Sequence, residues 1–174
     1  MTPVLIIPGL GGSGPLHWQS RWEALEPRYL RVQAPDWDRP ELAAWLSALD
    51  AAVKAVGQAP VIVAHSLGCL AVAHWAARGG QARAALLVAV PDPSGPEFPA
   101  VAHSFAPVPL LPLPFPTRVV ASRNDPYGGF EFAQRCAAAW RSAFSDVGHA
   151  CHINADSGLG DWAAGRLLLA DFLV

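Results

Sequence analysis

The sequence predicts an α/β protein, a three-layer α/β/α sandwich built on a mostly parallel sheet of about six strands. Short, continuously apolar runs recur along the chain, which is typical of strands that are buried on both faces of a parallel sheet. Segments with apolar residues at helical spacing lie between these runs. With 174 residues, 52% of them hydrophobic and 15% charged, the chain is expected to form one domain over residues 1–174 with a sizeable core.

The first half of the chain alternates strands and helices. Three runs predict strands: Val4–Ile7, Tyr29–Ala34 and Val61–Val63. Two stretches between them predict helices: Trp18–Leu25 and Leu42–Val56. Trp22 and Leu25 are expected to face the core. Asp38 and Glu41 resemble a capping box before the second of these helices.

The alternation continues in the second half. Three further runs predict strands: Ala84–Val90, Thr117–Ser122 and Ser142–Val147. Helical spacing or helix end signals predict three helices: Leu67–Ala77, Gly129–Trp140 and Trp162–Phe172. Asp161 is the expected cap of the last helix. Nine of the 17 prolines fall within residues 91–116, which predicts an extended surface loop that forms a wall or lid over a site. A loop without such a role is an equal alternative.

Ser66 lies between the third strand and the helix that follows it, in the motif A-H-S-L-G. Ala64 and Gly68 are small and let a tight turn close, as in the G-x-S-x-G elbow that presents a nucleophilic serine. Such a turn lifts the hydroxyl to the carboxyl edge of the sheet and aims the helix N-terminus at any negative charge that forms there. His65 is expected to point away from the pocket. The alternative is an ordinary strand-to-helix loop with a serine N-cap.

Two more polar residues follow strand ends in the order that this chemistry needs. Asp125 comes just after the fifth strand and His152 after the sixth, and residues at the carboxyl ends of parallel strands converge on one edge. A serine nucleophile requires a base within hydrogen-bond reach, and the base requires an orienting acid. Ser66, Asp125 and His152 are therefore the predicted nucleophile, acid and base. Asp92 is a fallback acid, and His149 an alternative base.

The loop Gly9–Gly14 has two functional interpretations besides a plain tight turn. It can present a backbone N–H to an oxyanion, and we expect the N–H groups of Leu10 and Leu67 to fill that role. It also matches G-x-G-x-x-G, with Asp36 farther on as a dinucleotide site would require. A P-loop is excluded because no Gly-Lys-Ser/Thr follows.

Three residues after the glycine loop are candidates for the substrate pocket: His17, Trp18 and Trp37. The alternative is that the tryptophans belong to the core. His149, Cys151 and His152 lack a fourth metal ligand at a recognised spacing, so no metal site is predicted, and no organic cofactor is required.

Several motifs carry a resemblance that spans nearly the whole chain: P-G-L-G-G-S-G, H-W-Q-S-R-W-E, P-D-W-x-x-P, H-S-L-G, S-R-N-D-P-Y and H-I-N-A-D-S-G-L-G-D-W. In these the sequence resembles the small bacterial serine hydrolases grouped with YdeN and retinoblastoma-binding protein 9. The resemblance implies an α/β-hydrolase fold without a separate cap domain, with Ser66, Asp125 and His152 as the triad. Two residues depart from the pattern: Ala64 replaces the first elbow glycine, and Cys151 stands where the family usually has glycine.

These observations together predict a serine hydrolase that cleaves small esters through an acyl-enzyme. A dinucleotide-binding oxidoreductase and a catalytically idle binding protein with a hydrolase fold are the alternatives. A net charge of −2 without a basic stripe argues against nucleic acid, and the longest apolar run is too short to span a membrane. Three cysteines without a C-x-x-C pair and an N-terminus without a signal-peptide pattern predict a cytoplasmic protein. The sequence indicates no particular protein partner.

Overall fold

A computed structural model describes residues 2–173, which contain one sheet of six strands, all parallel. The strands in chain order are β1 (Val4–Ile7), β2 (Tyr29–Arg31), β3 (Val61–His65), β4 (Ala84–Val88), β5 (Thr117–Ala121) and β6 (Ala143–Asp146). Their order across the sheet is β2-β1-β3-β4-β5-β6. The carboxyl end of β3 therefore lies at the middle of the sheet, between β1 and β4.

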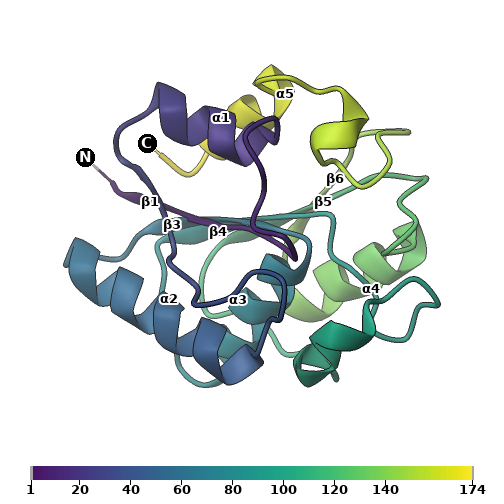
Figure 1. Ribbon diagram of the computed structural model, residues 1–174, viewed down its shortest axis with the longest axis horizontal. Coiled ribbons are helices and arrows are strands. Elements are labelled where there is room, and N and C mark those ends of the chain that lie inside the picture. The colour runs from purple at the N-terminus through teal and green to yellow at the C-terminus, as the bar shows by residue number, and fades with distance from the viewer. Residues whose placement is uncertain (1, 174) are drawn as a thin grey trace.

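Helices cover both faces of this sheet (Figure 1). One face carries α1 (Trp18–Leu25) and α5 (Ala163–Ala170), and the other carries α2 (Leu42–Val56), α3 (Leu67–Ala77) and α4 (Phe130–Trp140). Two short 3-10 helices complete the elements: η1 (Ala100–Phe105) and η2 (Ala155–Ser157). The three-layer architecture is thus confirmed, and residues 2–173 contain no separate cap domain. Within that same span, no helix is long and apolar enough to cross a membrane.

The apolar runs form the strands because both faces of the sheet are covered. Every residue of β1, β3 and β4 is buried. On the α1/α5 face, the indole rings of Trp18, Trp22 and Trp162 pack with centroid distances of 4.6 to 5.9 Å. On the other face, α3 is buried along almost its whole length. Helix α3 therefore has core residues all round rather than an apolar stripe.

Close packing seats the N-terminus of α3 on the end of β1. A Cβ at Gly68 would lie 2.6 Å from the carbonyl oxygen of Ile7 and 2.7 Å from that of Pro8. Both neighbours are backbone atoms, which cannot turn aside as a side chain can. Glycine at the second position of α3 is therefore what lets the helix start this close to the sheet.

Some local expectations are wrong. Leu25 is 50% exposed, because it ends the short helix α1 beyond the packed turn. Glu41 makes no side-chain cap bond for α2; the N–H of Leu42 instead donates to Ser104 Oγ at 3.1 Å. Asp161 does not cap α5; its carboxylate pairs with Arg21.

Two longer segments also differ from expectation. Strand β2 ends at Arg31 rather than at residue 34, because it is an edge strand with β1 as its one neighbour in the sheet. Residues 91–116 are not extended throughout, since they contain η1. The hydroxyl of Ser104 and the carbonyl oxygen of Phe105, both in η1, bond to the start of α2 and to His74 of α3.

Candidate active site

Ser66 sits in a strained turn between β3 and α3. Its φ is 53° and its ψ is −123°, and a non-glycine residue with positive φ is held there only by its surroundings. The Ser66 N–H donates to the carbonyl oxygen of Val88 in β4, which fixes the turn to the sheet. Ser66 precedes the helix but makes no side-chain cap bond. Its hydroxyl is therefore directed elsewhere.

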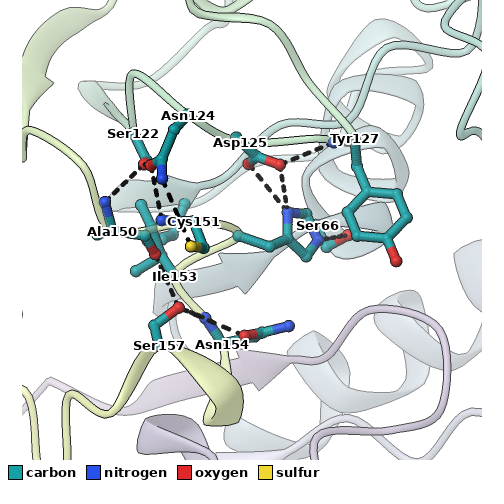
Figure 2. A network of polar contacts seen from close by, with 12 residues as sticks. Ser66, Ser122, Asn124, Asp125, Tyr127, Ala150, Cys151, Ile153, Asn154 and Ser157 are labelled. Carbon is teal, nitrogen blue, oxygen red and sulfur yellow. Dashed lines mark hydrogen bonds and ion pairs between the residues drawn. The ribbon is translucent and has the colours of Figure 1, made fainter.

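A chain of short hydrogen bonds joins the three residues that were expected to act together (Figure 2). Ser66 Oγ lies 2.8 Å from His152 Nε2, and His152 Nδ1 lies 2.9 Å from each carboxylate oxygen of Asp125. An ionised carboxylate only accepts, so Nδ1 carries the proton and Nε2 is free to accept from the serine hydroxyl. His152 and Asp125 are both buried, and the N–H of Tyr127 also donates to Asp125 at 2.9 Å.

The loop that carries His152 is held by side chains that follow β5. Asn124 Oδ1 accepts from the N–H of Cys151 at 2.9 Å, and Ser122 Oγ accepts from the N–H of Ala150 at 2.9 Å (Figure 2). The Ser122 hydroxyl donates in turn to Asn124 Oδ1. Neither residue has a role predicted from the sequence. The one sequence feature that could have indicated this role is the presence of two polar side chains, Ser122 and Asn124, just before Asp125. The loop that they hold lies about 27 residues farther along the chain.

Another correction concerns His65, which was expected to point away from the pocket. His65 instead lines the cavity beside Ser66 and its ring packs between those of His17 and His152, while its Nε2 lies 2.9 Å from the backbone carbonyl oxygen of His152. The elbow was expected to direct only its serine toward the site. It places the preceding side chain there as well, against the loop that carries His152.

A cavity of about 310 Å³ opens at Ser66 and His152. It is walled by the glycine loop, by the elbow and, from the proline-rich segment, by Pro91, Phe98, Pro99 and Ala102. None of the described residues that line it is Asp, Glu, Lys or Arg. Of the three predicted pocket residues, His17 lines the cavity. Trp18 is 1% exposed in the core, and Trp37 packs on Trp45 at a ring distance of 5.0 Å.

His17 is buried, and its Nδ1 accepts from the N–H of Gln19, so the ring caps α1. The other ring nitrogen, Nε2, has no partner among the described residues. Burial, together with the positive charge of Arg31 and any positive charge on His152, lowers the pKa of His17 to about 4. His17 is therefore a neutral side chain in the cavity wall at neutral pH.

The glycine loop packs directly against the serine. A Cβ at Gly9 would lie 2.8 Å from Ser66 Cβ, so only glycine permits this approach. Leu10 and Leu67 both line the cavity, and within residues 2–173 neither N–H has a hydrogen-bond acceptor. Arg31 of β2 holds the far side of the loop, because its guanidinium donates to the carbonyl oxygens of Gly12 and Ser13.

The remaining candidates lie outside this arrangement. The Asp92 carboxylate accepts from the N–H of Ser94, and the Asp36 carboxylate accepts from the N–H groups of Asp38 and Arg39, as turn residues do. His149 is exposed. Over residues 2–173, no group of three or more His, Cys, Asp or Glu side chains is arranged to hold a metal ion.

The chain matches the serine hydrolase family over residues 4–171. A crystal structure described as a YdeN-like hydrolase of Pectobacterium atrosepticum is 34% identical, with a TM-score of 0.89 over 99% of this chain and 90% of that one. The ydeN gene product of B. subtilis is 21% identical, with a TM-score of 0.79 and 99% of each chain covered.

An esterase from Thermogutta terrifontis shares the fold at 15% identity, with a TM-score of 0.74 over 99% of this chain and 89% of that one. No curated protein matches the sequence significantly. A family match over nearly all of the sequence, together with a structural relative above 30% identity, settles the assignment of an α/β-hydrolase fold. This chain therefore belongs to the serine hydrolase family.

Proposed function

We propose that this protein cleaves small esters, with Ser66 as nucleophile, His152 as general base and Asp125 as the acid that orients the base. The hydrogen-bond chain from Ser66 Oγ through His152 to Asp125 carries the proposal, because each distance lies within 2.8 to 2.9 Å. A serine hydroxyl is a weak nucleophile at neutral pH and becomes effective when an adjacent base takes its proton. The tautomer fixed by Asp125 leaves His152 Nε2 able to do so.

The reaction proceeds in two halves. Ser66 Oγ attacks the ester carbonyl while its proton passes to His152 Nε2, and Asp125 stabilises the imidazolium that forms. The tetrahedral oxyanion is bound by the N–H groups of Leu10 and Leu67, each donor lowering the barrier by about 3–4 kcal/mol. The alcohol leaves with the proton from His152. Water then attacks the acyl-enzyme with the help of the same base and releases the acid.

The cavity favours small, uncharged substrates. Its volume of about 310 Å³ suits a short acyl chain, and none of the described lining residues is Asp, Glu, Lys or Arg. A charged acyl group would lose its water there without gaining a partner of opposite charge. Phe98 and Pro99 from the proline-rich segment close one side, so that segment acts as a wall of the substrate pocket. Esters are preferred over amides because an ester carbonyl is more electrophilic than an amide carbonyl and an amide nitrogen must be protonated before it can leave.

Two measurements test the proposal. A fluorophosphonate probe should label the wild-type protein and not Ser66→Ala, and hydrolysis of chromogenic esters should fall by at least about 10⁴-fold in Ser66→Ala. Among acyl chains of increasing length, kcat/KM should be highest for short neutral chains. Equal labelling of wild type and Ser66→Ala would refute the assignment of the nucleophile. An unlabelled wild type without ester turnover would favour a binding protein with an idle site.

A further inference from the structure

His65 is a buried titratable side chain that takes no part in the proton transfers proposed above. It is the last residue of β3, directly before Ser66, and it is 4% exposed. Its Nε2 lies 2.9 Å from the carbonyl oxygen of His152. A carbonyl oxygen only accepts hydrogen bonds, so Nε2 carries the proton and donates it. The residue before the nucleophile is thus bonded to the backbone of the base.

The surroundings of His65 keep this donor in place. Burial lowers its pKa well below the usual value, and a positive charge on His17 or His152 would act in the same direction. The ring is therefore neutral at neutral pH. It lies edge-on to the ring of His17 at a centroid distance of 4.6 Å and is tilted against the ring of His152 at 4.9 Å. These contacts leave the imidazole little freedom to turn away from the loop that carries His152, residues 147–154, which we call the base loop.

The base loop needs such a contact because its backbone is strained on both sides of His152. Cys151 and Ile153 each have a φ of 49°, which is uncommon for residues other than glycine and unfavourable for a β-branched side chain. The bond from His65 reaches the peptide unit between His152 and Ile153. On the next unit along, the Trp18 indole N–H donates to the Ile153 carbonyl oxygen at 2.7 Å.

We propose that His65 is a positioning residue, whose hydrogen bond to the His152 carbonyl sets the separation between the base and the nucleophile. The inference rests on the proposed function of Ser66 and His152. Ser66 follows His65 in the chain, and His65 is hydrogen-bonded to the backbone carbonyl of His152. The Nε2 atom of His152 in turn lies 2.8 Å from Ser66 Oγ. This short closed path fixes the nucleophile and the base relative to each other. At the far end of the imidazole, Asp125 accepts from Nδ1.

Removal of the donor should affect the rate and leave binding nearly unchanged. His65→Leu keeps a buried side chain of similar size but cannot donate, whereas the Gln amide in His65→Gln can place an N–H near the position of Nε2. A shift of about 1 Å between reacting groups costs up to about 100-fold in rate. We therefore expect kcat of His65→Leu on a short chromogenic ester to fall about 10- to 100-fold, with KM within about twofold of wild type. His65→Gln should recover most of kcat.

His74 offers a matched control. Its Nε2 also bonds to a backbone carbonyl, that of Phe105 at 2.9 Å, which belongs to η1 and not to the base loop. His74→Leu should lower Tm as a lost histidine–carbonyl bond does, while kcat stays within about twofold. The downfield proton NMR resonance of the His152–Asp125 hydrogen bond provides a readout independent of turnover. It should shift or broaden in His65→Leu and stay unchanged in His74→Leu and His65→Gln.

The possible outcomes distinguish a failure of this inference from a failure of the proposed function. If Ser66→Ala abolishes hydrolysis but His65→Leu keeps wild-type kcat and an unshifted resonance, the positioning role is refuted and the esterase assignment stands. Equal kcat losses in His65→Leu and His65→Gln would also refute it. If the wild type hydrolyses no ester, the proposed function fails, and the NMR resonance still decides whether His65 positions His152. Should His65→Leu not fold, His65→Asn replaces it, because its shorter amide does not reach the carbonyl.

Discussion

Mild acid should destabilise this protein through His17. The side chain is 4% exposed, its Nδ1 is occupied by the N–H of Gln19, and its Nε2 has no partner in the described part of the chain. Burial lowers its pKa from 6.5 to about 4. Between these two values the unfolded chain binds a proton that the folded protein does not bind. The free energy of unfolding therefore falls as the pH drops below about 6.5, and it is unaffected by His17 at higher pH.

The size of the effect follows from the difference between the two pKa values. Each pH unit between them costs about 1.4 kcal/mol, so His17 should lower the free energy of unfolding by about 2 kcal/mol at pH 5, compared with about pH 7.5. The total approaches about 3 kcal/mol at the folded-state pKa of about 4. For a domain of this size, 2 kcal/mol is a large share of the net stability.

Denaturant titrations of wild type and His17→Asn at several pH values measure this contribution. Asn does not titrate, and its Oδ1 can accept from the N–H of Gln19 in place of Nδ1. The contributions of the carboxylates occur in both proteins and cancel in the difference. We expect the stability of wild type relative to His17→Asn to decrease by about 2 kcal/mol between about pH 7.5 and 5. A difference that stays constant over this range would refute the reasoning.

Two further predictions concern packing and thiol exposure. Gly68→Ala should destabilise the fold by about 3 kcal/mol in thermal or denaturant unfolding, because the new Cβ would lie 2.6 and 2.7 Å from two backbone carbonyl oxygens at the end of β1. Gly14→Ala, whose Cβ meets nothing within 4 Å, is the control, and equal stability of the two variants would contradict the packing argument. A thiol reagent should react rapidly with one cysteine of the native protein, Cys151, which is exposed, whereas burial shields Cys69 and Cys136 and raises the pKa of both thiols. All three should react after denaturation, and rapid reaction that persists in Cys151→Ser would contradict this prediction.

The fold was predictable because its main signals are local. The strands are continuous apolar runs, and burial on both faces of a parallel sheet requires such runs. The meeting of Ser66, Asp125 and His152 followed from one topological rule, that residues after parallel strands share an edge. The ends of elements were less predictable. Leu42 is capped by Ser104, about 62 residues away, and no pattern near residue 42 indicates this.

Whether an aromatic residue lines the pocket or packs in the core also depends on tertiary structure. His17 and Trp18 are adjacent in sequence, yet His17 lines the cavity and Trp18 is buried against Trp22 and Trp162. His17 is the N-cap of α1 and has extended backbone, whereas Trp18 is the first helical residue, so these neighbours face different surroundings. Which of the two faces the cavity is set by where α1 lies on the sheet. Sequence spacing does not contain that information.

Two segments of the site have strained backbone, the turn at Ser66 and the loop at His152, and they are held in different ways. This difference explains why the sequence predicted only the turn. The turn at Ser66 is fixed by its own neighbours, since β3 and α3 are buried on either side and Gly68 permits their approach. The loop at His152 follows an edge strand and precedes a 3-10 helix of three residues, so it has no comparable scaffold. Side chains from distant elements supply the missing support. Asn124, Trp18 and His65 each bond to one of three successive residues in this loop. Each of these bonds joins residues 27 or more positions apart, and their joint effect is to hold the His152 imidazole 2.8 Å from Ser66 Oγ.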